Sequence, residues 1–283
     1  LAADRAFRNA APETAHLAIG PWTHMPWNGA SGQSRMPEAE TYSVDRANIA
    51  FFDFYLKNRG NPPPALTLFD MGERRWRTFD HWPEAPEKPL ALASGGLAAT
   101  LANDGGLADE AGDGEDVLVS DPFRPAPLVG GHMGEPSGFV DRAAADDRSD
   151  VAVYTTAPFA RAFTLCGPVR ADITIDTEAP VFDLVATLSL VTPSGAANVI
   201  QTGISRTRNT GAPVSVGLRA AYVTVPAGFS LRLSLQAAAW PAFSLHAQDL
   251  ASADGMEPLT LAIRHAASRL VLSVLKEDTV NGA

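Results

Sequence analysis

The sequence predicts a mainly β fold: a jelly-roll β-sandwich preceded by the C-terminal end of an α/β domain. Up to residue 60, apolar residues form one short strand-like run and one stripe at helical spacing. Beyond the run Pro62-Pro63-Pro64 they alternate with polar residues, as in half-buried strands. Many short strands without intervening helices are typical of a β-sandwich, and a jelly roll is the expected topology.

Length, composition and charge exclude several classes of protein. A chain of 283 residues with 46% hydrophobic and 19% charged residues is neither disordered nor collagen-like. No stretch approaches the roughly 18 to 20 apolar residues of a membrane span, and the first residues lack the pattern of a signal peptide. We therefore expect no membrane partner, and the cytoplasm is favoured. A net charge of -10 without a Lys/Arg cluster argues against nucleic acid.

The first predicted strand ends at a Gly-Pro pair, and a histidine follows shortly after it. The strand is expected at residues 16–19, and Gly20-Pro21 ends it because proline donates nothing to a ladder and glycine bends freely. His24 therefore follows on a loop at the carboxyl end of a strand, where ligands gather in α/β sheets. Residues 4–11 before the strand are predicted to end a helix, with Asp4 as its N-cap.

One amphipathic helix is predicted after that loop. Ser43 can cap a helix over residues 44–58, and Gly60 with the following prolines ends it. Residues 25–42, between the histidine and the cap, are rich in Gly, Ser and Pro and are expected to form a loop. The apolar face of the helix consists of Val44, Ala47, Phe51, Phe54 and Tyr55.

The remaining chain is expected to form the sandwich, packed against the helix at 44–58. Alternation is clearest at residues 169–175 and 229–235. Further strands are predicted at residues 66–70, 117–119, 151–155, 184–191, 214–225, 259–263 and 270–275. We therefore divide the chain into residues 1–60 and a sandwich domain over residues 65–283.

The cysteine, the acidic run and the other histidines are expected to have structural or surface roles. Cys166, the single cysteine, excludes an intrachain disulfide and lies in an apolar strand, so a buried and inert thiol is expected. The acidic run at residues 109–116 does not match a calcium loop and is expected to be solvated. We expect no cofactor and no metal site. Five histidines lack metal-ligand spacing and are expected to be structural or surface residues: His16, His81, His132, His246 and His265.

The stretch Gly20-Pro21-Trp22-Thr23-His24 resembles the Gly-Pro-Trp-Ser-His motif of the cocaine esterase and α-amino-acid ester hydrolase group, which is related to X-prolyl dipeptidyl peptidases. Further stretches occur in the order of that family: Ala50-Phe51-Phe52-Asp53, Leu68-Phe69-Asp70-Met71-Gly72, Trp76, Trp82-Pro83, Asp121-Pro122, Gly130-Gly131 and Asp147-Arg148-Ser149-Asp150-Val151. The resemblance implies that residues 1–60 hold the last strand, catalytic-histidine loop and last helix of an α/β-hydrolase domain.

The resemblance implies that His24 is the base of a Ser-Asp-His triad. The nucleophile elbow and the acidic partner belong upstream of this histidine in the family, so an upstream hydrolase segment is the expected partner and the chain alone is expected to be inactive. Asp4 begins its predicted helix, which favours a helix cap over a triad acid. Ser31 and Ser34 follow His24 in an expected flexible loop, in the wrong order for a nucleophile.

Two classes of function remain open. The first is a serine-dependent hydrolase of small esters or amides that works through an acyl-enzyme, with this chain as its C-terminal portion. Trp22 and Trp27 flank His24 and either line the substrate pocket or serve as packing anchors. The second class is a non-catalytic jelly-roll binding or interaction module. The sequence leaves the substrate and any homo-oligomer undetermined.

Overall fold

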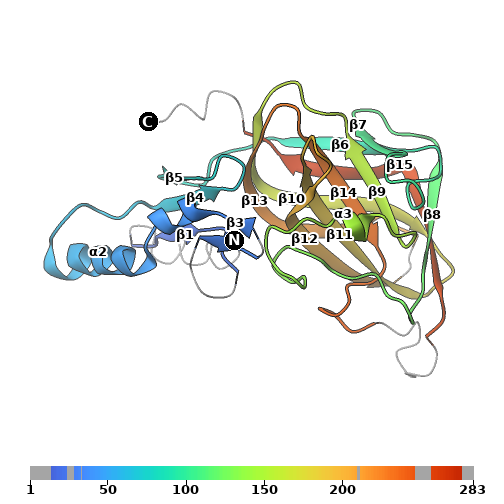
Figure 1. The fold of residues 1–283 in the computed structure, drawn as a ribbon, viewed down its shortest axis with the longest axis horizontal. Coiled ribbons are helices and arrows are strands. Elements are labelled where there is room, and N and C mark those ends of the chain that lie inside the picture. Colours follow the sequence, from blue (N-terminus) through green and yellow to red (C-terminus); the bar gives the residue numbers. More distant parts are fainter. Residues whose placement is uncertain (1–13, 24–28, 33, 209–210, 246–255, 276–283) are drawn as a thin grey trace.

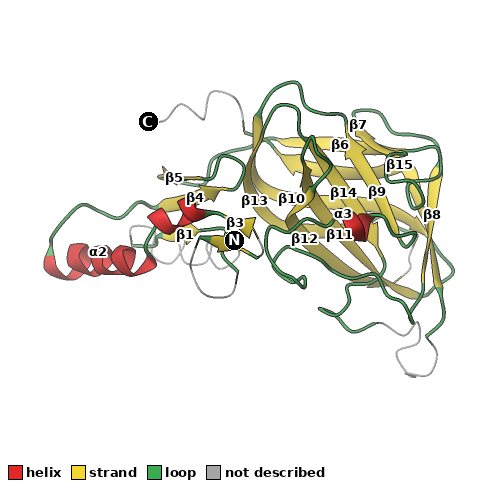
Figure 2. Cartoon of the chain, viewed as in Figure 1, coloured by secondary structure: helices red, strands yellow, loops and turns green. Residues whose placement is uncertain are grey.

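The computed structural model describes residues 14–23, 29–32, 34–208, 211–245 and 256–275. Strands dominate the described chain, with one long helix at one end (Figure 2). The expected helix at residues 4–11 and its cap Asp4 lie outside the described residues, as do His24, Trp27 and His246. In the part of the chain that is described, no helix is long and apolar enough to cross a membrane.

A small sheet precedes the sandwich. Strand β1 (Leu17–Ile19) pairs in parallel with β4 (Leu66–Asp70), and β4 pairs antiparallel with β5 (Arg75–Phe79). Helix α2 (Val44–Lys57) lies between the two parallel strands in the chain, so β1, α2 and β4 form a βαβ unit. The connection before α2 contains β2 (Ala30–Ser31), β3 (Ser34–Arg35) and the 3₁₀ helix η1 (Pro37–Thr41).

The sandwich was expected to begin at residue 65, but β4 at residues 66–70 belongs to the small sheet. Strand β4 is hydrogen-bonded to β1 on one side and to β5 on the other, and these three strands form a sheet separate from the large one. All five residues of β4 are buried, as is typical of a strand covered on both faces. The proline run thus connects α2 to the second parallel strand, and the exact domain boundary remains a prediction.

Helix α2 begins and ends as the sequence predicts, but it does not pack against the sandwich. Ser43 Oγ accepts a hydrogen bond from the Arg46 N–H at 3.3 Å, and Asn58 ends the helix in a left-handed conformation. No residue of α2 is buried, and the helix extends away from the sandwich in Figure 1. The expected packing was wrong because the crossover places α2 beside β1, where His16 bridges Tyr55 OH at 2.8 Å and the Pro64 carbonyl at 2.9 Å.

The second part of the chain forms one large sheet that folds over its own core. Its strands are β6 (Glu87–Ala93), β7 (Gly105–Ala108), β8 (Glu115–Ser120), β9 (Val151–Thr156), β10 (Phe163–Asp176), β11 (Val181–Val191), β12 (Ala197–Arg208), β13 (Val214–Val225), β14 (Ser230–Gln236) and β15 (Leu259–Ser273). Their order is β12-β11-β14-β9-β7-β6-β15-β10-β13, with β8 pairing with β15. The two end strands approach each other, since Gln201 Nε2 donates to the Ala220 carbonyl at 3.0 Å. The β-sandwich prediction is confirmed.

The expected strands agree with the structure best where alternation is regular. The predictions at 66–70 and 214–225 coincide with β4 and β13. The runs at 259–263 and 270–275 belong to a single strand, β15, whose register shifts at residues 265–268. Strands β5, β6, β7 and β12 were not predicted from the sequence, because their polar, glycine or proline residues interrupt the apolar pattern.

The core is apolar, and the segment before α2 contributes to it. Fully buried leucines from different strands meet between the layers, among them Leu118, Leu184, Leu188 and Leu233. Met36 and Ala39, at and beside η1, are also fully buried and belong to the same cluster. The chain between β1 and α2 is thereby fixed on the sandwich through apolar burial.

The turn between β4 and β5 contacts β13 through Asp70, which is fully buried. The carboxylate accepts hydrogen bonds from the Thr224 N–H at 2.8 Å and from Thr224 Oγ1 at 2.5 Å. It also accepts one from the Gly72 N–H at 2.9 Å. A Cβ on Gly72 would overlap the Thr224 carbonyl oxygen, so only glycine allows this approach.

A second buried carboxylate lies inside the sandwich. Asp116 Oδ2 accepts from Ser94 Oγ and Tyr154 OH and lies 2.7 Å from His265 Nε2, while Oδ1 accepts from the Ala98 N–H at 2.8 Å. Burial raises the pKa of Asp116, but the four hydrogen bonds outweigh this effect and hold the pKa below its ordinary value of 3.8. The ionised form therefore stabilises the fold.

We expect Gly72→Ala to lower the free energy of unfolding by about 2 to 3 kcal/mol, because the added methyl group forces the β4–β5 turn away from Thr224. The measurement is urea unfolding of the chain. Gly217→Ala is the matched control: it also lies in backbone without a positive φ, and its Cβ would meet nothing within 4 Å. Equal losses in the two variants would contradict the close approach.

We expect Asp116→Asn to cost about 2 to 4 kcal/mol at pH 7, because an amide cannot accept from all four donors. Since the folded pKa is depressed, the carboxylate's contribution is present above pH 4 and is lost as the pH falls through the folded value. Urea unfolding from pH 7 to pH 3 should therefore show the difference from wild type shrinking. The exposed neighbour Asp113→Asn is the control, and a pH-independent difference would argue against ionised Asp116.

Candidate functional site

The candidate site is the segment that begins at the carboxyl end of β1. Its predicted base His24 and the flanking Trp27 lie in residues 24–28, outside the described residues. The described residues before and after this segment show what holds its two ends. These are Trp22 and Thr23 on one side and the chain from Gly29 onward on the other.

The upstream end is held in an aromatic cluster of Trp22, Tyr42, Phe69 and Trp76. The Trp22 and Trp76 rings lie 5.4 Å apart, and Trp76 also contacts Tyr42 at 4.7 Å and Phe69 at 5.2 Å between ring centroids. Burial raises the pKa of Tyr42. Trp22 thus makes packing contacts, while its Nε1–H is buried and has no hydrogen-bond partner among the described residues.

The downstream end is held by two hydrogen bonds to Gly29. Its N–H donates to Glu40 Oε1 at 3.0 Å, and its carbonyl accepts from the Met36 N–H at 2.6 Å. Met36 is fully buried in the sandwich core, and the Ala39 carbonyl accepts from Trp76 Nε1 at 3.4 Å. The chain that leaves the candidate site is therefore anchored both to the sandwich and to the aromatic cluster.

Ser31 and Ser34 lie in a hairpin and not in the expected flexible loop. They are opposite each other in the β2–β3 pair. Ser31 Oγ accepts from the Phe139 N–H at 3.0 Å, and Ser34 Oγ donates to the Phe139 carbonyl at 2.5 Å. The expectation of flexibility was wrong because backbone groups far away in the sequence satisfy both hydroxyls. Neither of these bonds resembles that of a nucleophile to a base.

Ser94, Asp116 and His265 have the residue types of a triad but not its geometry. His265 Nε2 lies 2.7 Å from Asp116 and 3.3 Å from Ser94 Oγ, so one nitrogen faces both groups. In a catalytic triad, opposite ring nitrogens face the serine and the acid. His265 and Asp116 are fully buried, and the Ser94 hydroxyl donates to Asp116. The cluster is structural, as the sequence predicts for His265.

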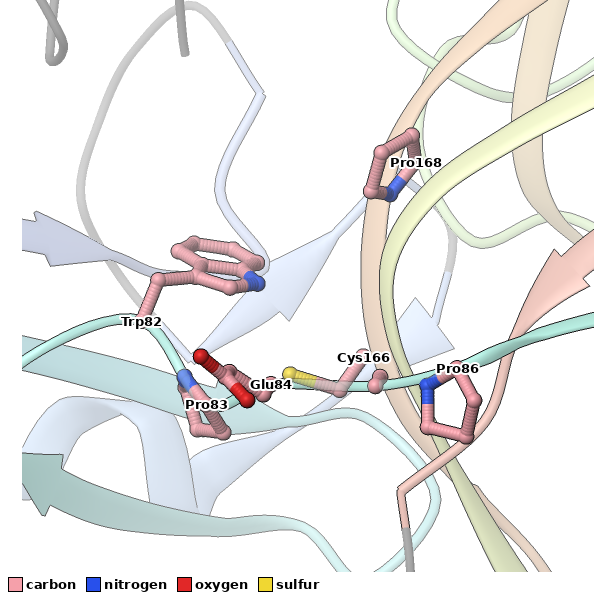
Figure 3. A pocket seen from close by; sticks show the side chains of 7 residues that line it. Trp82, Pro83, Glu84, Pro86, Cys166 and Pro168 are labelled. Atoms are coloured by element: carbon pink, nitrogen blue, oxygen red, sulfur yellow. The ribbon is translucent and has the colours of Figure 1, made fainter.

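A groove of about 660 Å³ runs between the β5–β6 connection and β10. Figure 3 shows Trp82 and Glu84 on one side of it and Pro86 and Pro168 on the other, with Cys166 between them. Cys166 is 1% exposed, and burial raises the pKa of its thiol to about 12. The groove therefore presents a protonated thiol and not a nucleophile, and the expectation of a buried cysteine is confirmed.

His132 lies in the connection that follows β8 and contacts β12. His132 follows Gly131 and lies 3.4 Å from Thr202 Oγ1; burial, followed by the charge of Arg219, lowers the pKa of His132. Among the described residues, no group of three or more His, Cys, Asp or Glu side chains is arranged to hold a metal ion.

Residues 58–250 match the family described as the X-Pro dipeptidyl-peptidase C-terminal non-catalytic domain. The cocaine esterase of Rhodococcus sp. (strain MB1 Bresler) is 31% identical over 208 residues, which cover 69% of this chain and 36% of that enzyme. The chain thus spans about a third of the length of this curated relative.

Two solved structures share the fold over nearly the whole chain. An aminopeptidase from a marine sediment Thaumarchaeota archaeon superposes with a TM-score of 0.80 at 18% identity, over 96% of this chain and 51% of its own. An α-amino acid ester hydrolase superposes with a TM-score of 0.79 at 21% identity, over 95% of this chain and 52% of its own. Together with the sequence match, this fold shows that the chain belongs to the hydrolase family of cocaine esterase and X-Pro dipeptidyl peptidase, and that it carries the family's C-terminal non-catalytic domain.

Proposed function

We propose that the chain is the C-terminal portion of a serine-dependent acyl hydrolase and that it supplies the triad histidine, His24. The observation that carries this proposal is the position of the motif. Gly20-Pro21-Trp22-Thr23-His24 begins directly at the carboxyl end of β1, a parallel strand of a βαβ unit. In α/β sheets this edge is where ligands and catalytic side chains are found.

The small sheet and α2 are, in this proposal, the last elements of an α/β-hydrolase domain. A sheet of three strands with a helix exposed along its length buries little apolar surface by itself. Ile49, Phe52 and Leu56 of α2 are 61%, 53% and 73% exposed. An upstream hydrolase segment that extends the sheet would cover these three exposed side chains and bring the serine and aspartate to His24.

The reaction follows from the residue types. His24 accepts the proton of the upstream serine as the serine oxygen bonds to the acyl carbon, and the aspartate orients the imidazole. The bond to the leaving group then breaks, and the leaving oxygen or nitrogen takes the proton from the imidazolium. A water molecule, deprotonated by the same histidine, releases the acid from the acyl-enzyme and restores the serine.

We propose small esters or amides as substrates, with Trp22 and Trp27 beside the acyl group. Trp22 packs on Trp76, yet its buried Nε1–H has no partner among the described residues. An unpaired buried donor close in sequence to the base is available to a substrate or to the upstream segment.

The alternative, a sugar-binding or interaction module, requires a row of exposed aromatic side chains on one face of the sandwich. In the described sandwich, the exposed large aromatic side chains are Phe123 and Trp240. Both lie in connections and not on the face of a strand. This placement favours the hydrolase.

In the full-length protein with its upstream segment, we expect His24→Ala to lower kcat for p-nitrophenyl acetate by about 10⁴, because the serine loses its proton acceptor. Stopped-flow release of p-nitrophenol should show an acyl-enzyme burst in the wild type only. His81→Ala, which changes an exposed histidine, is the control. Retention of most activity in His24→Ala, or esterase activity in residues 1–283 alone, would contradict the assignment.

A further inference from the structure

The hairpin that follows the candidate site is held by an unusual pair of bonds. Ser31 and Ser34 form one cross-strand pair, and their hydroxyls bind the N–H and the C=O of the same residue, Phe139. Ser31 is 2% exposed and Phe139 is 7% exposed, so water competes little for these bonds. We call this arrangement the serine clamp.

The backbones on either side of the serine clamp are in direct contact. A Cβ on Gly138 would lie 2.5 Å from the Gly32 nitrogen, and a Cβ on Gly32 would overlap the Ser137 carbonyl oxygen. Gly32 has a φ of +60° and Gly138 a φ of +94°, which glycine adopts without strain. The hairpin thus fits closely against residues 137–139.

The partner of the clamp, residues 128–142, is itself rigidly held. Gly131 and Gly138 exchange both backbone hydrogen bonds, at 2.8 and 2.7 Å. The Val140 carbonyl accepts from the Val199 N–H of β12 at 3.0 Å. At the far end, buried Arg142 forms an ion pair with Asp146 at 2.7 Å. This segment is therefore part of the sandwich and can serve as a fixed support.

The clamp is close in the chain to the proposed base. Ser31 is two residues after Gly29, where the segment 24–28 ends, and the Met36 N–H binds the Gly29 carbonyl at 2.6 Å. Without the clamp, Gly29 keeps its hydrogen bonds to Met36 and Glu40, and both partners lie on the connection before α2, which buried Met36 anchors in the sandwich core. The clamp adds a tie to Phe139, more than a hundred residues away.

We propose that Ser31 and Ser34 are positioning residues, through which the non-catalytic sandwich fixes the downstream end of the histidine-bearing segment. This inference rests on the proposed function and assigns the sandwich a part in it. A misplacement of about 1 Å at a catalytic group can cost about 10² in rate. Loss of the clamp therefore lowers the rates of acylation and deacylation together, because His24 is the base in both steps, while the substrate and the serine are unchanged.

The test uses the full-length enzyme and p-nitrophenyl acetate, with the burst amplitude counting active sites. We expect Ser31→Ala/Ser34→Ala to keep the burst amplitude but to lower kcat per active site by about 10 to 100-fold, with KM changed less than about threefold. Because Ser34→Thr retains the hydroxyl, its kcat should be higher than that of Ser34→Ala and close to that of the wild type. Ser194→Ala removes a turn hydroxyl bound to Thr192 at 2.8 Å and is the matched control.

The acidic limb of the kcat/KM profile is a second readout. An imidazole that loses its alignment with the acid is less easily protonated, so the limb should move to lower pH in the double variant. A smaller burst with unchanged kcat per site would mean that the clamp serves only folding, and it would overturn the inference. If His24→Ala retains activity, the proposed function is overturned. If His24→Ala is inactive while the double serine variant has the kcat of the wild type, only the inference about the clamp is overturned.

Discussion

The contact between Asp70 and Thr224 is the constraint on which the arrangement of the two sheets depends. A buried carboxylate at the end of β4 accepts both the N–H and the hydroxyl of Thr224 on β13. Because an unpaired buried carboxylate is costly, the turn has essentially one favourable position on the sandwich. β4 pairs with β1, so this position also determines where the chain enters the candidate site.

Three further contacts also hold the chain on either side of the candidate site in place. The aromatic cluster connects Trp22 to β5 through Trp76, the buried Met36 anchors the connection before α2, and the serine clamp joins the hairpin to Phe139. Each uses a different type of interaction, namely aromatic packing, apolar burial and hydrogen bonding. A domain without its own nucleophile can contribute to catalysis in this way, by holding a neighbouring segment in place.

The buried polar groups illustrate why residue type alone does not identify a site. Ser94, Asp116 and His265 are far apart in sequence and meet in the core, yet their hydrogen-bond directions suit a structural cluster. Conversely, Ser31 and Ser34 are close in sequence to the proposed base but bind backbone groups of the sandwich. Geometry, and not spacing, distinguishes the two situations.

The sequence by itself determined the mainly β class, the limits of α2, the strands with regular alternation and the likeness of residues 20–24 to the family motif. These features follow from local periodicity, capping and turn chemistry, which neighbouring residues carry. Only the tertiary structure decided that β4 pairs with β1, that α2 extends away from the sandwich and that Ser31 and Ser34 hold Phe139. The tertiary contacts join residues that are far apart in the sequence, from 48 positions for His16 and Pro64 to 154 positions for Asp70 and Thr224. No local sequence pattern specifies such partners, because burial and hydrogen bonding select them only once the chain is folded.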